Sequence, residues 1–138
     1  MNTLKHYQID SSFNRFELRL EDDFLQRTDI GVDPSMFKHL CITLSNQIVH
    51  YEEAHGIIDI AGTPSAKTPL SPSYYRKDLI SYQFDFTSGE FIFTLKIKSF
   101  MSSEDYVLKI DPAIAKWFVV ECVNAIVQYE ESYGTIAL

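Results

Sequence analysis

One stretch of the chain places histidines and carboxylates at a spacing that could ligate a metal. Starting at residue 50 it reads HYEEAH, which sets a histidine and a glutamate three residues apart twice, as His50 with Glu53 and Glu52 with His55. Helical residues at that spacing share a face, and imidazole with carboxylate is a common ligand set. The related stretch QYEESY at 128–133 keeps the acids but not the histidines. A solvated polar helix end is the favoured interpretation, and we expect neither a metal nor a cofactor.

Other patterns for catalysis are missing from the sequence. There is no GxSxG, HExxH, CxxC or DxDxDG motif, and none of the five glycines forms a phosphate-binding loop. Cys41 and Cys122 fall within expected helices, where we predict buried, reduced and unreactive thiols. We therefore name no catalytic residue and lean away from an enzyme, while an active site assembled from scattered residues stays open.

Charge and composition limit the classes of partner that we expect for this chain. The net charge is −7, and no cluster of Lys and Arg suggests a phosphate-binding surface, so nucleic acid is not expected. The amino terminus lacks the apolar run of a signal peptide. The most apolar run, 114–127, is interrupted by Lys116, Glu121 and Asn124, which favours a core helix over a membrane span. We expect a cytoplasmic protein whose partner is a protein with a basic surface.

The strongest pattern in the chain is an internal repeat. Residues 33–60 and 111–138 match without a gap at 11 of 28 positions, whereas average composition gives about two by chance. Residues 7–20 and 82–95 also align, with Tyr-Gln-x-Asp at the start of each. We predict a single α+β domain, 1–138, made of two repeats of a β-hairpin–β–α–β unit: repeat one at 1–60, a linker at 61–78 and repeat two at 79–138. The two units would be related by a pseudo-twofold axis.

Alternating apolar residues define the strands of each unit. Residues 82–97 alternate around a Ser88-Gly89 turn, which indicates a hairpin with one buried face. Third strands are expected at 28–32 and 106–110, and short final strands at 57–60 and 135–138. One-sided alternation predicts an antiparallel sheet with two long helices packed on one face.

Both helices carry the same start and stop signals. Asp33 and Asp111 are expected N-caps, each followed by proline at the first helical position, and Gly56 and Gly134 are expected to end the helices with a left-handed residue. About 22 residues lie between these signals. One face of each helix is apolar and should lie on the sheet. These inward residues are Phe37, Leu40, Cys41, Leu44, Ile48 and Tyr51, with Ala115, Phe118, Val119, Cys122, Ile126 and Tyr129.

The outward helix faces are more apolar than a solvated surface requires. They carry Lys38, His39, Ile42, Asn46, Val49 and Glu53 in the first helix, and Lys116, Trp117, Val120, Asn124, Val127 and Glu131 in the second. Lysine, asparagine, valine and glutamate are identical between the copies. Two explanations stay open: the helices pack on each other within the monomer, or this surface binds a second chain.

Acidic residues supply the other candidate surfaces. Glu52, Glu53, Glu130 and Glu131 lie in the last helical turns, where the helix dipole disfavours negative charge. A basic partner would offset this cost, as would a lysine or arginine of the chain itself or solvent screening. Glu21, Asp22 and Asp23 form a third acidic cluster, in a loop. We count all seven acids as candidate partner-binding residues.

Small acidic α+β chains without catalytic motifs are typical of toxin-neutralising immunity proteins and phage-encoded inhibitors. We therefore predict a non-enzymatic protein that binds and inhibits another protein. One alternative is a small-ligand-binding domain or enzyme, with a site between the repeats lined by Tyr7, Tyr82, Tyr51 and Tyr129. Another is a chaperone-like or adaptor-like homodimer that buries the outward helix faces.

Overall fold

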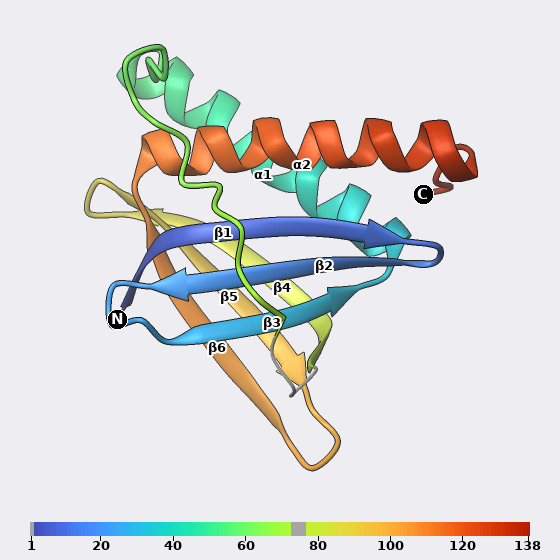
Figure 1. The fold of residues 1–138 in the computed structure, drawn as a ribbon. Coiled ribbons are helices and arrows are strands. Elements are labelled where there is room, and N and C mark those ends of the chain that lie inside the picture. The colour runs from blue at the N-terminus through green and yellow to red at the C-terminus, as the bar shows by residue number, and fades with distance from the viewer. Residues whose placement is uncertain (1, 73–76) are drawn as a thin grey trace.

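Six strands and two helices form an α+β fold in the computed structural model, which describes residues 2–72 and 77–138 (Figure 1). In chain order they are β1 (Asn2–Ser12), β2 (Arg15–Asp22), β3 (Arg27–Val32), α1 (Pro34–His55), β4 (Lys77–Thr87), β5 (Glu90–Lys98), β6 (Ser103–Ile110) and α2 (Pro112–Tyr133). We call β1–β3 with α1 the first half, and β4–β6 with α2 the second half. The predicted α+β class is confirmed, and both helices lie on the same side of the sheet (Figure 1).

The strands close into a barrel in the order β1-β2-β3-β4-β5-β6. Pairing within each half is antiparallel, as predicted. The halves meet through two short parallel junctions, so the prediction of a wholly antiparallel sheet is wrong there. The junctions pair Asn2 with Leu108 and Thr3 with Lys109 between β1 and β6, and Ile30 with Lys77 and Gly31 with Asp78 between β3 and β4. At β3/β4 the chain crosses over through α1, which returns it in the same direction.

The predicted turn between β4 and β5 is confirmed. Ser88 and Gly89 both have positive φ angles, 54° and 81°. Two successive positive φ angles match the twist of an antiparallel pair and make the tightest hairpin connection. The alternation that follows is also confirmed, because Phe91, Phe93 and Leu95 are buried.

Both helices begin as the sequence predicts. The Asp33 carboxylate accepts a hydrogen bond from the Ser35 N–H at 3.1 Å, and the Asp111 carboxylate accepts one from the Ala113 N–H at 3.0 Å. Each cap satisfies a backbone donor that has no partner inside the helix. Within the described part of the chain, neither helix is long and apolar enough to cross a membrane.

Glycine ends each helix as predicted, but the predicted left-handed helical conformation of these glycines is wrong. Gly56 and Gly134 have φ angles of 93° and 94°, and each donates its N–H to a carbonyl in the last turn at 2.9 Å. Their ψ angles, 165° and 170°, place them outside the left-handed helical region and in a region that is populated essentially by glycine alone. The chain therefore leaves each helix through a glycine with an extended ψ angle.

The predicted final strands at 57–60 and 135–138 do not form. Instead, the Ile58 and Ile136 side chains are buried, and their N–H groups bond to the glutamates in the preceding helical turns. Ile58 N–H donates to the Glu52 carboxylate at 2.8 Å, and Ile136 N–H donates to the Glu130 carboxylate at 2.7 Å. In each case a glutamate carboxylate accepts the backbone N–H that would otherwise be free to bond to a neighbouring strand.

The core lies between the inner surface of the sheet and the inward helix faces. The predicted inward residues are buried or half-buried throughout. Aromatic rings join the layers, with Phe16 stacked on Phe37 at 4.1 Å between ring centres and Tyr129 5.0 Å from Phe16. Cys41 and Cys122 are buried free thiols, as predicted, and burial raises the pKa of each.

The segment after α1 runs across the outside of β1 and β2 (Figure 1). It is held by the backbone of β1, because Tyr7 N–H donates to Ala66 C=O at 3.1 Å and Thr68 N–H donates to Tyr7 C=O at 2.9 Å. This is the pattern of a parallel strand reduced to a single bridge, between Tyr7 and Lys67. We call residues 63–70 the docked linker. The linker seals Tyr7 from solvent, and burial raises the pKa of its phenol to about 12.

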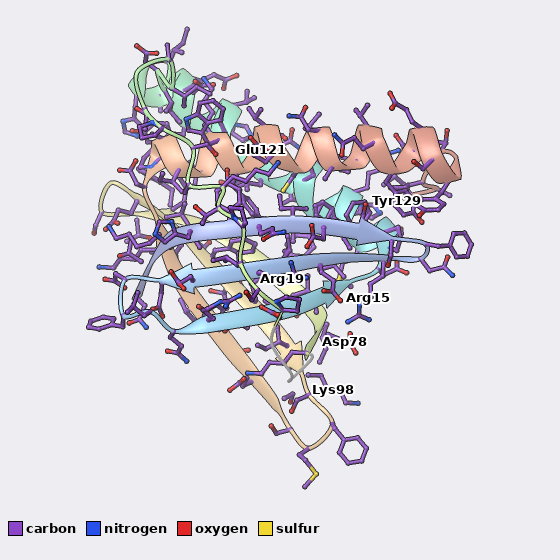
Figure 2. All side chains as sticks on the ribbon, viewed as in Figure 1. Arg15, Arg19, Asp78, Lys98, Glu121 and Tyr129 are labelled. Carbon is purple, nitrogen blue, oxygen red and sulfur yellow. The ribbon has the colours of Figure 1, made fainter. Side chains whose placement is uncertain are left out.

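Side chains fix the docked linker at both ends. The Trp117 indole N–H donates to Thr63 C=O at 2.7 Å, and Lys67 pairs with Glu121 at 3.2 Å. At the other end, Leu70 N–H donates to the Gln8 side-chain oxygen. Figure 2 shows Glu121 of α2 facing this segment.

A buried arginine lies beneath the end of the linker (Figure 2). Arg19 donates to Leu70 C=O at 3.3 Å and pairs with Asp10, with Asp29 at 3.7 Å and with Glu17 at 3.5 Å. A buried cation is tolerated only when it is paired and hydrogen bonded, so this cluster depends on the linker for one of its acceptors.

Removing the backbone bond at the bridge should loosen the linker. A Thr68→Pro variant lacks the N–H that donates to Tyr7 C=O, so we expect the free energy of unfolding to fall by about 1–3 kcal/mol. Thr68→Val keeps the N–H and should stay within about 0.5 kcal/mol of the parent. Urea unfolding followed by fluorescence of Trp117, the one tryptophan in the chain, measures both. Equal losses in the two variants would contradict the bridge.

Candidate functional site

The outward faces of α1 and α2 enclose an apolar groove. Its volume is about 260 Å³. The floor is formed by Cys41 and Ile126, which belong to the core. The rim is formed by Lys38, Ile42, Ser45, Asn46, Val123 and Val127. We call this feature the helix groove; it brings together Ile42, Asn46 and Val127 from the predicted site.

The apolar residues along the helix groove are open to solvent. Ile42, Val123 and Val127 are 42%, 43% and 48% exposed, and Val49, further along α1, is 51% exposed. Helix–helix packing within the monomer therefore accounts for part of the outward faces and leaves these four valine and isoleucine side chains uncovered. Clustered exposed apolar residues of this kind mark interaction surfaces more often than scattered ones do.

The rest of the predicted apolar site lies elsewhere. Trp117 is half-buried, with its indole N–H bonded to the docked linker, and Val120 is half-buried as well. Asn124 is exposed on the linker side of α2, where it lines a small cavity with Lys67 and Glu121. These three residues do not join the helix groove.

Two reciprocal ion pairs tie the start of each helix to the end of the other. Lys38 of α1 donates to the Glu130 carboxylate at 2.8 Å and to Ile136 C=O at 3.1 Å. Lys116 of α2 donates to the Glu52 carboxylate at 2.7 Å and to Ile58 C=O at 2.8 Å. We call this set of contacts the lysine clasps.

The lysine clasps supply positive charge that offsets the unfavourable placement of Glu52 and Glu130 at the helix ends. A lysine of the facing helix lowers the pKa of Glu52 by hydrogen bonding, and the Ile58 N–H lowers it further. Lys38 and the Ile136 N–H lower the pKa of Glu130 in the same way. The compensating charge comes from within the chain, so these two acids have structural partners already. Their neighbours Glu53 and Glu131 are exposed.

The acidic cluster at 21–23 organises a corner between β2 and β3. Its central side chain, Asp22, is buried. The Asp22 carboxylate accepts hydrogen bonds from the Asn2 side chain at 2.7 Å and from the N–H groups of Phe24 at 2.8 Å and Gln26 at 2.9 Å. This carboxylate holds the loop in shape and faces away from any partner. The acids on either side of it remain accessible in part.

The histidine and glutamate stretch gives only one weak pair. His50 Nδ1 lies 3.8 Å from a Glu53 carboxylate oxygen, and both side chains are exposed. The ring of His55 instead contacts Tyr51, with 4.7 Å between ring centres. Among the residues that the structure describes, no three His, Cys, Asp or Glu side chains gather in a way that could hold a metal ion.

The four tyrosines of the alternative ligand site pack in different places. The ring of Tyr7 contacts Phe118, that of Tyr51 contacts Phe86 and Phe91, that of Tyr82 contacts Phe84, and that of Tyr129 contacts Phe16 and Tyr133. The Tyr129 hydroxyl also accepts a hydrogen bond from the Asn14 N–H of the first hairpin at 3.3 Å. These rings serve mainly to join the helices to the sheet.

Sequence reasoning missed several exposed residues. Val123 belongs to the helix groove, and its position four residues from Val119 and from Val127 could have placed it there. Phe24 and Leu25, and likewise Phe100 and Met101, are strongly exposed in the loops before the third strand of each half. No periodic signal marks these loop residues.

The sequence matches no protein-family model, and comparison with curated proteins finds no significant match.

The lysine clasps make a prediction about acid unfolding. A carboxyl group whose folded pKa is lowered stabilises the fold above its unfolded pKa of about 4.3, and this stabilisation is lost as the pH falls through the folded value. An E52Q/E130Q double variant should therefore lose less stability than the parent between pH 6 and pH 3. Urea unfolding at a series of pH values gives the slopes.

The matched control is the E53Q/E131Q double variant, which removes the same charges one residue further along, at exposed positions. Its stability should follow the pH dependence of the parent protein more closely. If both double variants flatten the pH dependence equally, general charge repulsion rather than the lysine clasps accounts for the effect.

Proposed function

We propose that this chain is a non-enzymatic protein-binding protein of the inhibitor or immunity class, which engages its partner through the helix groove. The observation that carries the proposal is the row of exposed apolar side chains along the outward faces of α1 and α2. The other faces of these helices pack on the sheet or on the docked linker. A partner would insert an apolar side chain between Ile42 and Val127. Burial of such a row is worth about 25 cal/mol for each Å² removed from water.

Charge defines the chemistry expected of this partner. Glu53 and Glu131 are exposed at the helix ends, and their neighbours in the lysine clasps already have cationic partners. With a net charge of −7 on the chain, a partner with a basic rim around an apolar centre fits best. We also propose a cytoplasmic location, in keeping with two free cysteines.

We further propose that the fold is a tandem duplication with a pseudo-twofold axis. Its support is the order of elements, three strands and a helix in each half, together with the matching caps and helix ends. The lysine clasps support it too, because Lys38 with Glu130 and Lys116 with Glu52 exchange the same contacts in both directions. Such an arrangement would give the partner two related helix surfaces.

The groove can be tested by comparing baits in a quantitative affinity capture from the source cell. The V127D variant places a charge at the exposed rim, and we expect it to lose at least tenfold of the captured partner. I57D, at an exposed residue outside the groove, serves as the matched control and should retain the partner. A partner captured equally by both variants would overturn the groove as the site.

Charge reversal separates the electrostatic part of the interface. An E53K/E131K variant leaves the lysine clasps in place and should slow association with a basic partner, with a weaker salt dependence of the on-rate. Surface plasmon resonance against the captured partner at two salt concentrations measures this. An unchanged on-rate would remove these acids from the interface. A captured partner that proves to be a second copy of the chain would favour the homodimer.

A further inference from the structure

Two strands of the barrel, β1 and β4, extend furthest beyond the parallel junctions. Within residues 2–72 and 77–138, β1 pairs with β6 only at Asn2 and Thr3, and β4 pairs with β3 only at Lys77 and Asp78. Beyond these residues β1 is paired with β2 and, through the single bridge at Tyr7, with the docked linker. β4 is paired there with β5. Both strands also have a register shift just before the open segment, after Leu4 in β1 and after Leu79 in β4.

The open edges present backbone groups in the same register. Tyr7 lies opposite Leu20, and Tyr82 lies opposite Leu95. In an antiparallel pair, alternate residues direct both backbone groups toward the neighbouring strand or away from it. Tyr7 directs its N–H and C=O away from β2, since both bond to the docked linker. The matching register gives Tyr82 the same outward orientation on β4.

At the β1 edge the docked linker shows how an extended segment binds. One residue accepts from Tyr7 N–H, the residue two further on donates to Tyr7 C=O, and the residue four further on donates to the Gln8 side chain. The Gln8 side chain is held for this purpose by its NH₂ group, which donates to Asp10 at 3.1 Å. The segment lies beside α2, with Lys67 paired to Glu121.

The β4 edge carries the equivalent tyrosine and glutamine, Tyr82 and Gln83. The Gln83 NH₂ group donates to the Asp85 carboxylate at 2.8 Å, which leaves the side-chain oxygen of Gln83 as an acceptor. The Tyr82 hydroxyl lies 3.2 Å from the hydroxyl of Thr43 on α1. Among the described residues no backbone group bonds to Tyr82 outside the β4/β5 ladder, and Tyr82 is half-exposed where Tyr7 is buried.

We propose that the β4 edge binds an extended segment of a partner protein by parallel strand addition, with Tyr82 as the backbone clamp and Gln83 as the second acceptor. Strand addition is a common mode of peptide recognition, and an unpaired edge is its template. The chain's own linker on β1 is the model for the occupant. At the β1 edge, Lys67 of the linker pairs with Glu121 of α2. At the β4 edge, the corresponding residue of the occupant would face Thr43 of α1, so we expect a small or polar uncharged residue there.

A second copy of the chain is a less suitable occupant. Pairing two β4 edges would bring together two chains that each carry a net charge of −7. It would also bring the two α1 helices against each other, because α1 packs on β4. This edge is separate from the helix groove, so the two surfaces can succeed or fail independently.

The test uses the whole chain and a library of random twelve-residue peptides displayed on phage. Enriched peptides are synthesised and added to the ¹⁵N-labelled protein. We expect saturable shifts of the amide signals of residues 81–85, and no change at β1, which the docked linker occupies. The Q83L variant should weaken binding about tenfold, the effect of losing one hydrogen bond of about 1.4 kcal/mol. T87A, at an exposed residue on the same strand, should bind like the parent.

Backbone methylation of the peptide tests the register directly. Methylating the N–H that donates to Tyr82 C=O should abolish binding, whereas methylating the next residue should preserve it, because alternate N–H groups face away from the strand. The proposal is overturned if no peptide is enriched, or if shifts are confined to the helix groove or to β1. A concentration-dependent dimer with protected β4 amides would also overturn it, in favour of a second copy. Loss of the groove partner in V127D leaves this result unaffected.

Discussion

Among the described residues, two pairs at each parallel junction join the halves of the sheet, and the rest of the structure depends on this constraint. Because the junctions are so short, most of β1 and most of β4 lie beyond them, where the other half of the sheet supplies no paired strand. Both helices lie over the sheet, and aromatic rings of Phe16, Phe37 and Tyr129 join the two layers. The linker completes one edge with a single bridge.

Charge compensation in this fold is nonlocal. Each helix ends in glutamates that its own dipole disfavours, and a lysine at the fifth residue of the other helix neutralises one of them. The same carboxylates accept the first backbone donors beyond the helix, so one side chain performs both tasks. The helix ends are thereby fixed in place, and the exposed apolar residues of the groove lie on a rigid support, which suits a binding surface.

Local signals in the sequence were enough to predict the two helices and the three strands that precede each of them. Capping residues placed both helices, and alternation around Ser88 and Gly89 placed the second hairpin. The parallel junctions could not be predicted, because two residue pairs between distant strands leave no periodic pattern. The stretch after each helix was misjudged as a strand, since an apolar run does not reveal that its N–H groups bond to Glu52 and Glu130.

The candidate site was predicted in part for similar reasons. The helical spacing of the sequence identified Ile42 and Val127 as outward residues. Which outward residues share a groove depends on how the two helices cross, and the sequence does not give that crossing. Repetition of lysine and glutamate between the copies was visible in the sequence. Their pairing was not, because the partners of one clasp lie 92 residues apart in the chain. The burial of Asp22 was not predicted either. It depends on tertiary contacts such as the hydrogen bond from the Asn2 side chain, which the run of three acids in the sequence does not indicate.

The reciprocity of the lysine clasps has a consequence for how the chain could be divided. Neither half can neutralise its own helix-terminal glutamate, since each depends on a lysine that the other carries. A polypeptide severed between its halves would therefore yield two fragments that are each incomplete in charge and in sheet edge, and complementary to the other in both. Such fragments would recognise one another with defined geometry, which makes the fold a natural candidate for a split reporter.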